Sequence, residues 1–221
     1  MNRVNIDKLP PDTYITNAST PLERITHWGL AGSCIILFIT GAGFMFRSLN
    51  IIQRILAFVP GGAKTVHHTF AIVFIISLVL ALLVWGKDCI FNLEDIKWFK
   101  VLGGYVIRTD QHFDLGKFNP GQKIFTWYCI GFGIAISITG YIMYTPFDFA
   151  RSTVQISYPI HALCAAAFGI GWLGHWYLGA WANPGSVASI TSGRARLAWC
   201  KHHRPKWLRK MQKEGKLKIA K

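Results

Sequence analysis

Two histidines occupy one strongly apolar stretch of the sequence, residues 159–182. His161 and His175 are fourteen positions apart. An α-helix turns by about 100° per residue and rises by about 1.5 Å, so this spacing brings the two side chains to within roughly 40° of one direction and separates them by roughly 21 Å. One helix would therefore present two imidazoles from nearly the same face, at two depths of a lipid bilayer.

Four of the eight histidines lie at or inside the ends of apolar segments, and they form two pairs. His67 and His161 each open a segment on one side of the membrane, whereas His27 and His175 lie on the other side. Ionisable side chains inside membrane spans are costly, so they are functional candidates by default. A lone histidine is as readily a hydrogen-bonded structural residue, but two pairs matched in depth, each drawn from two helices, favour a cofactor.

The chemistry of such pairs points to haem. Two imidazoles from facing helices are the usual axial ligands of a non-covalent haem, and helix bundles build cofactor sites in this way. Zinc or copper would need three or four ligands, and no Cys, Asp or Glu accompanies either pair. A proton relay would more often include carboxylates within the spans, which contain none. The five cysteines are scattered singly, without a C-x-x-C pair or a C-x-x-C-H haem attachment motif.

The elements that must position these histidines are four apolar segments, each close to the ~20 residues that cross a bilayer. They are residues 27–46, 67–85, 124–144 and 159–182. Composition agrees, because 15% of the residues are charged, against about 25% in soluble domains. The predicted fold is an all-α membrane protein, a four-transmembrane-helix bundle binding two haems b. Its expected parts are an N-terminal arm (1–26), the bundle (27–182) and a basic tail (183–221), with a short interfacial helix after the first span and a loop before the fourth.

The distribution of positive charge predicts the orientation. The net charge is +14, and 11 of the 24 Lys and Arg residues lie in the last 28 positions. The arm, the loop at 86–123 and the tail together hold 20, and the other two loops hold 4. The positive-inside rule then places both termini and the 86–123 loop in the cytoplasm. The tail is expected on anionic lipid rather than on nucleic acid, because no basic patch interleaved with aromatic residues occurs outside it.

Three sequence motifs extend this interpretation: R-x-x-H-W at 24–28, "GKFNPGQK" at 116–123 and "KHHRPKWLR" at 201–209. Together with the histidine spacing of the last span, they resemble the cytochrome b (gamma) subunit of respiratory, membrane-bound formate dehydrogenases, over residues 20 to 212. The resemblance implies that His67 and His161 ligate an outer haem b, and that His27 and His175 ligate an inner one. His68, offset from its neighbour by about 100°, is the alternative ligand.

The "NPGQK" element lies just before the third span, on the side assigned to the cytoplasm. Pro-Gly is a turn signal, and a turn here would expose backbone N–H groups beside two amide side chains. A loop that merely caps a helix is the alternative interpretation. The resemblance implies that Asn119, Gly121 and Gln122, together with His175, bind menaquinone or ubiquinone. Pro120 departs from the small residue of the family.

The function that the resemblance implies is electron transfer and quinone reduction within a formate dehydrogenase, without formate oxidation by this chain. The implied partners are a molybdenum- or tungsten-containing catalytic alpha subunit and an iron–sulfur beta subunit with its own membrane helix. Two alternatives stay open: the dihaem cytochrome b of a nickel–iron hydrogenase or another periplasmic oxidoreductase, and a transporter or passive anchor with structural histidines. His112, His202 and His203 are expected in solvent or at a subunit interface.

Overall fold

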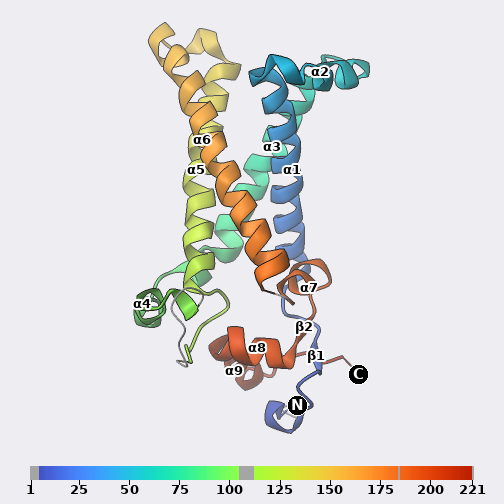
Figure 1. Ribbon diagram of the computed structural model, residues 1–221, viewed down its shortest axis with the longest axis vertical. Coiled ribbons are helices and arrows are strands. Elements are labelled where there is room, and N and C mark those ends of the chain that lie inside the picture. The colour runs from blue at the N-terminus through green and yellow to red at the C-terminus, as the bar shows by residue number, and fades with distance from the viewer. Residues whose placement is uncertain (1–4, 105–111, 184, 221) are drawn as a thin grey trace. The chain divides into compact units, whose positions relative to one another are not determined.

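Four long helices dominate the computed structural model, which describes residues 5–104, 112–183 and 185–220 (Figure 1). They are α1 (Pro21–Met45), α3 (Gly62–Trp85), α5 (Pro120–Tyr144) and α6 (Arg151–Tyr177). Each is long and apolar enough to cross a membrane. The predicted all-α membrane bundle with four spans is therefore confirmed.

Most of these helices belong to one compact unit, residues Ile25–Leu83 and Tyr128–Gly174, which we call the membrane unit. Large apolar side chains on its surface, such as Leu163 and Ile170, are 70% and 73% exposed, as contact with lipid requires. Inside the unit, small residues allow helices to approach closely. A Cβ atom at Gly133 of α5 would lie 2.8 Å from the Leu78 side chain of α3.

The helices begin earlier than the hydrophobic pattern predicted. Helix α1 starts in a capping box, in which Thr20 Oγ1 accepts from Glu23 N at 3.2 Å and Glu23 Oε2 accepts from Thr20 N at 2.7 Å. Helix α6 starts at Arg151, so most of the expected loop before the fourth span is helical. Its polar side chains remain satisfied there, since the Ser157 hydroxyl donates to the Thr153 carbonyl at 2.8 Å. Pro159 lies within the helix rather than at its start.

Short helical segments connect the spans. The expected interfacial helix after the first span consists of η2 (Arg47–Leu49), α2 (Ile51–Ile55) and η3 (Leu56–Phe58). The remaining connections contain η4 (Gly86–Cys89), α4 (Leu93–Lys100), η5 (Leu102–Gly104) and η6 (Pro146–Asp148), and α6 continues into the π-helical turn η7 (Leu178–Ala182).

The second compact unit joins Met1–Arg24, Val84–Trp127 and His175–Lys221, and we call it the terminal unit. Its N-terminal part contains η1 (Ile6–Lys8) and β1 (Tyr14–Ile15); its C-terminal part contains α7 (Ser186–Thr191), β2 (Ala195–Arg196), α8 (Leu197–His203) and α9 (Pro205–Lys213). Strands β1 and β2 pair antiparallel, with Tyr14 opposite Arg196. This small sheet lies beside α8 in Figure 1.

A hydrophobic core unites the arm with the tail. It comprises Ile6, Ile15, Ala18, Ala195, Leu197, Cys200, Trp207, Leu208 and Leu217. The buried guanidinium of Arg204 donates to the Ala18 carbonyl at 3.2 Å and lies 4.9 Å from the ring centroid of Trp199. The arm and the tail, which lie at opposite ends of the sequence, therefore fold together as part of the terminal unit.

Candidate functional site

The predicted outer pair lies within the membrane unit, on α3 and α6. His67 lies on α3 and His161 on α6, and the two imidazoles are near neighbours. Each imidazole also contacts a threonine on the neighbouring helix: His67 Nδ1 lies 2.7 Å from Thr40 Oγ1 of α1, and His161 Nδ1 lies 3.1 Å from Thr139 Oγ1 of α5. The structure thus brings these two predicted residues together and adds two hydroxyl groups.

The hydrogen-bond partners favour a hydrogen on Nδ1 of each histidine. His161 Nδ1 lies 3.1 Å from the Ile136 carbonyl oxygen, which can only accept, so Nδ1 carries the hydrogen. The Thr40 hydroxyl lies 2.8 Å from the Ile36 carbonyl and can direct its hydrogen there, which leaves its oxygen as an acceptor for His67 Nδ1–H. With Nδ1 protonated in this way, Nε2 of each ring keeps the lone pair that a metal ion requires.

His68 has different surroundings from those of His67. Its ring packs edge-on against Tyr144, with centroids 4.7 Å apart, whereas the His67 ring packs against Phe44 at 5.5 Å. His67 Nδ1 has a hydrogen-bond partner in Thr40. Because metal-ligating histidines usually have such a partner on the other ring nitrogen, this contact favours His67 over His68 as the ligand.

The two residues predicted to form the inner pair belong to different compact units. His27, in the membrane unit, contacts Trp28 edge-on, with ring centroids 5.2 Å apart. His175, in the terminal unit, stacks on Phe125 with centroids 4.3 Å apart and an interplanar angle of 2°. Their pairing stays a prediction.

The "NPGQK" element forms the first turn of α5 through reciprocal hydrogen bonds. Asn119 Oδ1 accepts from Gln122 N at 2.8 Å, and Gln122 Oε1 accepts from Asn119 N at 3.0 Å. Pro120 is the first residue of α5, where its fixed φ suits a helix and its missing N–H costs nothing. The helix-capping alternative is therefore realised. The cap uses only the amide oxygens, so it holds both –NH2 groups in fixed orientations.

A buried ion pair supports this turn from α4. Lys123 Nζ lies 2.7 Å from Asp95 Oδ2 and donates to the Ile90 carbonyl at 3.0 Å, and both charged side chains are almost completely buried. Asp95 Oδ2 also accepts from Asn92 N at 2.6 Å, within the capping box of α4. The first turns of α4 and α5 are thus joined by one carboxylate.

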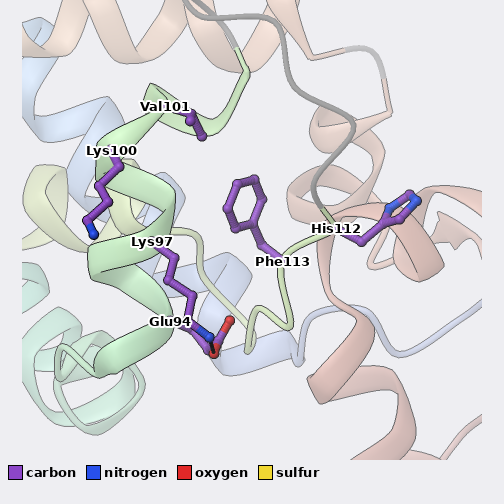
Figure 2. A pocket seen from close by; sticks show the side chains of 6 residues that line it. All are labelled: Glu94, Lys97, Lys100, Val101, His112 and Phe113. Carbon is purple, nitrogen blue, oxygen red and sulfur yellow. Dashed lines mark hydrogen bonds and ion pairs between the residues drawn. The ribbon is translucent and has the colours of Figure 1, made fainter.

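The remaining histidines lie in the terminal unit. Figure 2 shows a pocket lined by Glu94, Lys97, Lys100, Val101, His112 and Phe113, in which the Phe113 ring faces α4 and the His112 ring points away from it. His203 is half-buried beside Trp199, at 4.8 Å between ring centroids. Burial lowers the His203 pKa to about 4, and the nearby His202 and Arg204 add to this effect.

Comparison with protein families gives a match to the prokaryotic cytochrome b561 family, whose model covers residues 18–193. The chain belongs to this family. Proteins of this cytochrome b family carry haem b, and the donor set of the outer pair fits such a group, since two Nε2 atoms on facing helices are free of hydrogen.

Among curated relatives, this cytochrome b561 family member is similar to three formate dehydrogenase subunits. It is 31% identical to the cytochrome b556 subunit of Haemophilus influenzae, over 95% of this chain and 87% of the relative. It is 28% identical to the cytochrome b556(fdo) subunit of Escherichia coli K12, over 88% and 92%. It is 25% identical to the nitrate-inducible b556(Fdn) subunit of the same strain, over 87% and 89%.

Sequence reasoning missed Thr40, Thr139 and the Asp95–Lys123 pair of this cytochrome. A signal for the threonines was present, because Ile-Thr-Gly occurs at 39–41 and again at 138–140, in the first and third spans. No such signal marked the ion pair, whose partners are 28 positions apart in the polar connection between the second and third spans.

Proposed function

We propose that this chain is the dihaem cytochrome b subunit of a formate dehydrogenase complex in a bacterial inner membrane. It anchors the complex and carries electrons from periplasmic formate oxidation, through two haems b, to menaquinone or ubiquinone on the cytoplasmic side. The observation that carries this proposal is the His67–His161 pair, whose Nδ1 hydrogens are both engaged by the protein and whose Nε2 atoms are open. Family membership and the names of the relatives support it.

Different residues of the chain would ligate the haems and bind the quinone. Haem b, when bound, supplies a one-electron redox centre. His67 and His161 would hold the outer haem and His27 and His175 the inner one. A molybdenum- or tungsten-containing alpha subunit would oxidise formate, and an iron–sulfur beta subunit would pass the electrons to this chain.

The turn at Asn119–Gln122 would bind the quinone. Its two amide –NH2 groups are held by the capping box, and donors fixed in advance are the ones that best stabilise oxygen atoms as they gain negative charge. Phe125, which stacks on His175, lies three residues, or about one helical turn, beyond Gln122 on α5. The turn and the imidazole are therefore neighbours within the terminal unit.

The direction of transfer gives the proposed site its energetic role. Electrons would move inward while the quinone takes its protons from the cytoplasm. Moving one elementary charge across the membrane potential is worth about 2.3 kcal/mol per 100 mV. Quinone reduction at the cytoplasmic end would thus conserve energy, whereas reduction at the outer haem would not.

Haem content and donor specificity test the proposal in the purified complex. We expect a pyridine haemochrome assay to give two haems b per chain, both extracted by acid–acetone, and formate to reduce both. One haem per chain would overturn the dihaem assignment. No haem in a folded chain would favour a transporter or passive anchor, and reduction by hydrogen but not by formate would replace formate dehydrogenase with a hydrogenase.

A further inference from the structure

The same three residues, Ile-Thr-Gly, face each imidazole of the outer pair. On α1 they are residues 39–41, opposite His67, and on α5 they are residues 138–140, opposite His161. Both threonines are buried, at 1% and 7% exposure. Two unrelated helix pairs thus arrive at one local arrangement around a histidine.

We propose that Thr40 and Thr139 are positioning residues that fix the outer haem ligands and set the reduction potential of that haem, with Thr40 having the larger effect. This inference rests on the proposed function, because it concerns a haem held by His67 and His161.

The threonine hydroxyl is suited to accept rather than donate here. In each case its hydrogen is directed to a carbonyl oxygen of its own helix four residues earlier, Ile36 for Thr40 at 2.8 Å and Ala135 for Thr139 at 2.7 Å. The oxygen lone pairs then face the neighbouring helix, where they can accept from an imidazole N–H. A helix in lipid thereby presents a hydrogen-bond acceptor without leaving any backbone group unsatisfied.

The glycine after each threonine leaves room for the ring. A Cβ atom at Gly41 would lie 3.6 Å from His67 Cε1, and one at Gly140 would lie 3.2 Å from His161 Cε1. The second distance is tighter than ordinary packing, so a larger residue at position 140 would press on the His161 ring. In each arrangement, the threonine hydroxyl bonds to the Nδ1 atom of the imidazole, and the glycine leaves space for the adjacent Cε1 atom.

An acceptor on Nδ1–H makes the imidazole a stronger electron donor to a metal at Nε2, which stabilises the oxidised iron and lowers the reduction potential. The two histidines differ in how many acceptors they have. His161 Nδ1 also reaches the Ile136 carbonyl, at 3.1 Å. In the part of the chain that the structure describes, Thr40 is the one hydrogen-bond partner of His67 Nδ1, so its removal leaves that hydrogen unbonded.

Potentiometric titration of the haem absorption bands in the purified, haem-loaded complex tests this inference. The outer haem is assigned as the spectral component that is missing in His161→Ala. We expect Thr40→Val, which is nearly isosteric and lacks the acceptor, to shift the outer haem to a more positive potential, with a several-fold larger reduced fraction at a fixed potential. Thr139→Val should give a smaller shift of the same sign.

Matched variants separate the hydrogen bond from packing. Thr40→Ser keeps a hydroxyl and should restore the wild-type potential. Ser137→Ala, on α5, removes a hydroxyl that donates to the Gly133 carbonyl at 2.7 Å, and it should leave both potentials unchanged. If Thr40→Val loses the outer haem while Thr40→Ser keeps it, the positioning role is supported.

Three results would overturn the inference while the proposed function stands: unchanged potentials in Thr40→Val, loss of the outer haem in Thr40→Ser as well, or an equal shift in Ser137→Ala. Absence of haem from the wild-type complex would instead overturn the proposed function itself.

Discussion

The outer histidine pair and the "NPGQK" turn obtain their polar groups from opposite parts of a helix. At the histidine pair, the acceptors are hydroxyls toward the C-terminal ends of α1 and α5, and each hydroxyl remains bonded to its own helix. At the turn, the proposed donors are the amide –NH2 groups of Asn119 and Gln122, whose oxygens cap the first turn of α5.

This difference follows from the solvent around each region. Within lipid, every backbone group is already used, so a helix interior offers only side chains whose own hydrogen-bonding groups are satisfied. A helix start, by contrast, is capped by polar side chains, and the donors that the cap does not use can serve a substrate. The two proposed sites therefore call for different experiments.

The largest expected effect is at the histidine pair. His161→Ala should remove one of the two haems completely, because alanine has no atom that can ligate iron. The other haem should stay reducible by quinol. The measurement is haem content per chain together with a reduced-minus-oxidised spectrum. His68→Ala is the control and should retain both haems. If His67→Ala keeps both haems and His68→Ala loses one, the ligand is His68 and not His67.

The next effect concerns the ion pair beneath the turn. Lys123→Met would leave the Asp95 carboxylate buried without its cation, and breaking such a pair typically costs about 3–5 kcal/mol. We expect a marked loss of thermal stability in detergent. Lys97→Met is the matched control, because the Lys97–Glu94 pair is exposed and such pairs contribute about 0–1 kcal/mol. Equal melting temperatures for the two variants would contradict this reading of the pair.

The proposed quinone donors should give a smaller but specific effect on rate. Asn119→Leu and Gln122→Leu should slow quinol formation, since loss of one oxyanion donor typically costs about 2.7–4 kcal/mol in the transition state. Haem reduction by the donor, followed by stopped flow, should stay unchanged. Wild-type turnover in both variants would place the quinone elsewhere, most readily at the outer haem.

A second pair of variants separates donation from helix capping. Asn119→Ser and Gln122→Glu keep an oxygen for the capping box but lack the –NH2 group. We expect them to slow quinol formation as the leucine variants do. If only the leucine variants are slow, the residues serve the fold of α5 and not the quinone.

The smallest effect is a pH dependence in the tail. Burial lowers the His203 pKa to about 4, from the usual 6.5, so the folded tail resists a proton that the unfolded tail accepts. The stability of the arm–tail core should therefore be complete above pH 6.5 and fall as the pH drops toward 4. Limited proteolysis across this range measures it. His203→Gln should flatten the profile, and an unaltered profile in that variant would exclude this histidine as the cause.

Hydropathy predicted the four spans well, because a bilayer imposes a length and a composition that local sequence must meet. It missed the first turns of α6, since Arg151, Ser152 and Thr153 are polar and Pro159 resembles a helix start. The reciprocal Asn119–Gln122 cap could be predicted as one of two alternatives, because both partners lie within four residues.

Contacts between distant residues had no comparable signal. Whether Thr40 faces a histidine depends on the rotation of α1 against α3, which hydropathy alone does not determine. The pairing of β1 with β2 likewise depends on segments that are each only two residues long. The positions of the histidines in the spans predicted the candidate ligands, and the structure showed which residues surround them.

The shared core of arm and tail also orders events during synthesis. Tyr14 and Arg196 are 182 positions apart, so the arm leaves the ribosome long before its partner strand exists. Ile6 and Ile15 therefore stay exposed to solvent until all four helices have been synthesised and the tail packs against them. The last part of the chain to be synthesised therefore buries the first residues. A chain that is truncated, or that inserts with the wrong number of spans, keeps its N-terminal arm exposed to the proteases that remove unfinished proteins.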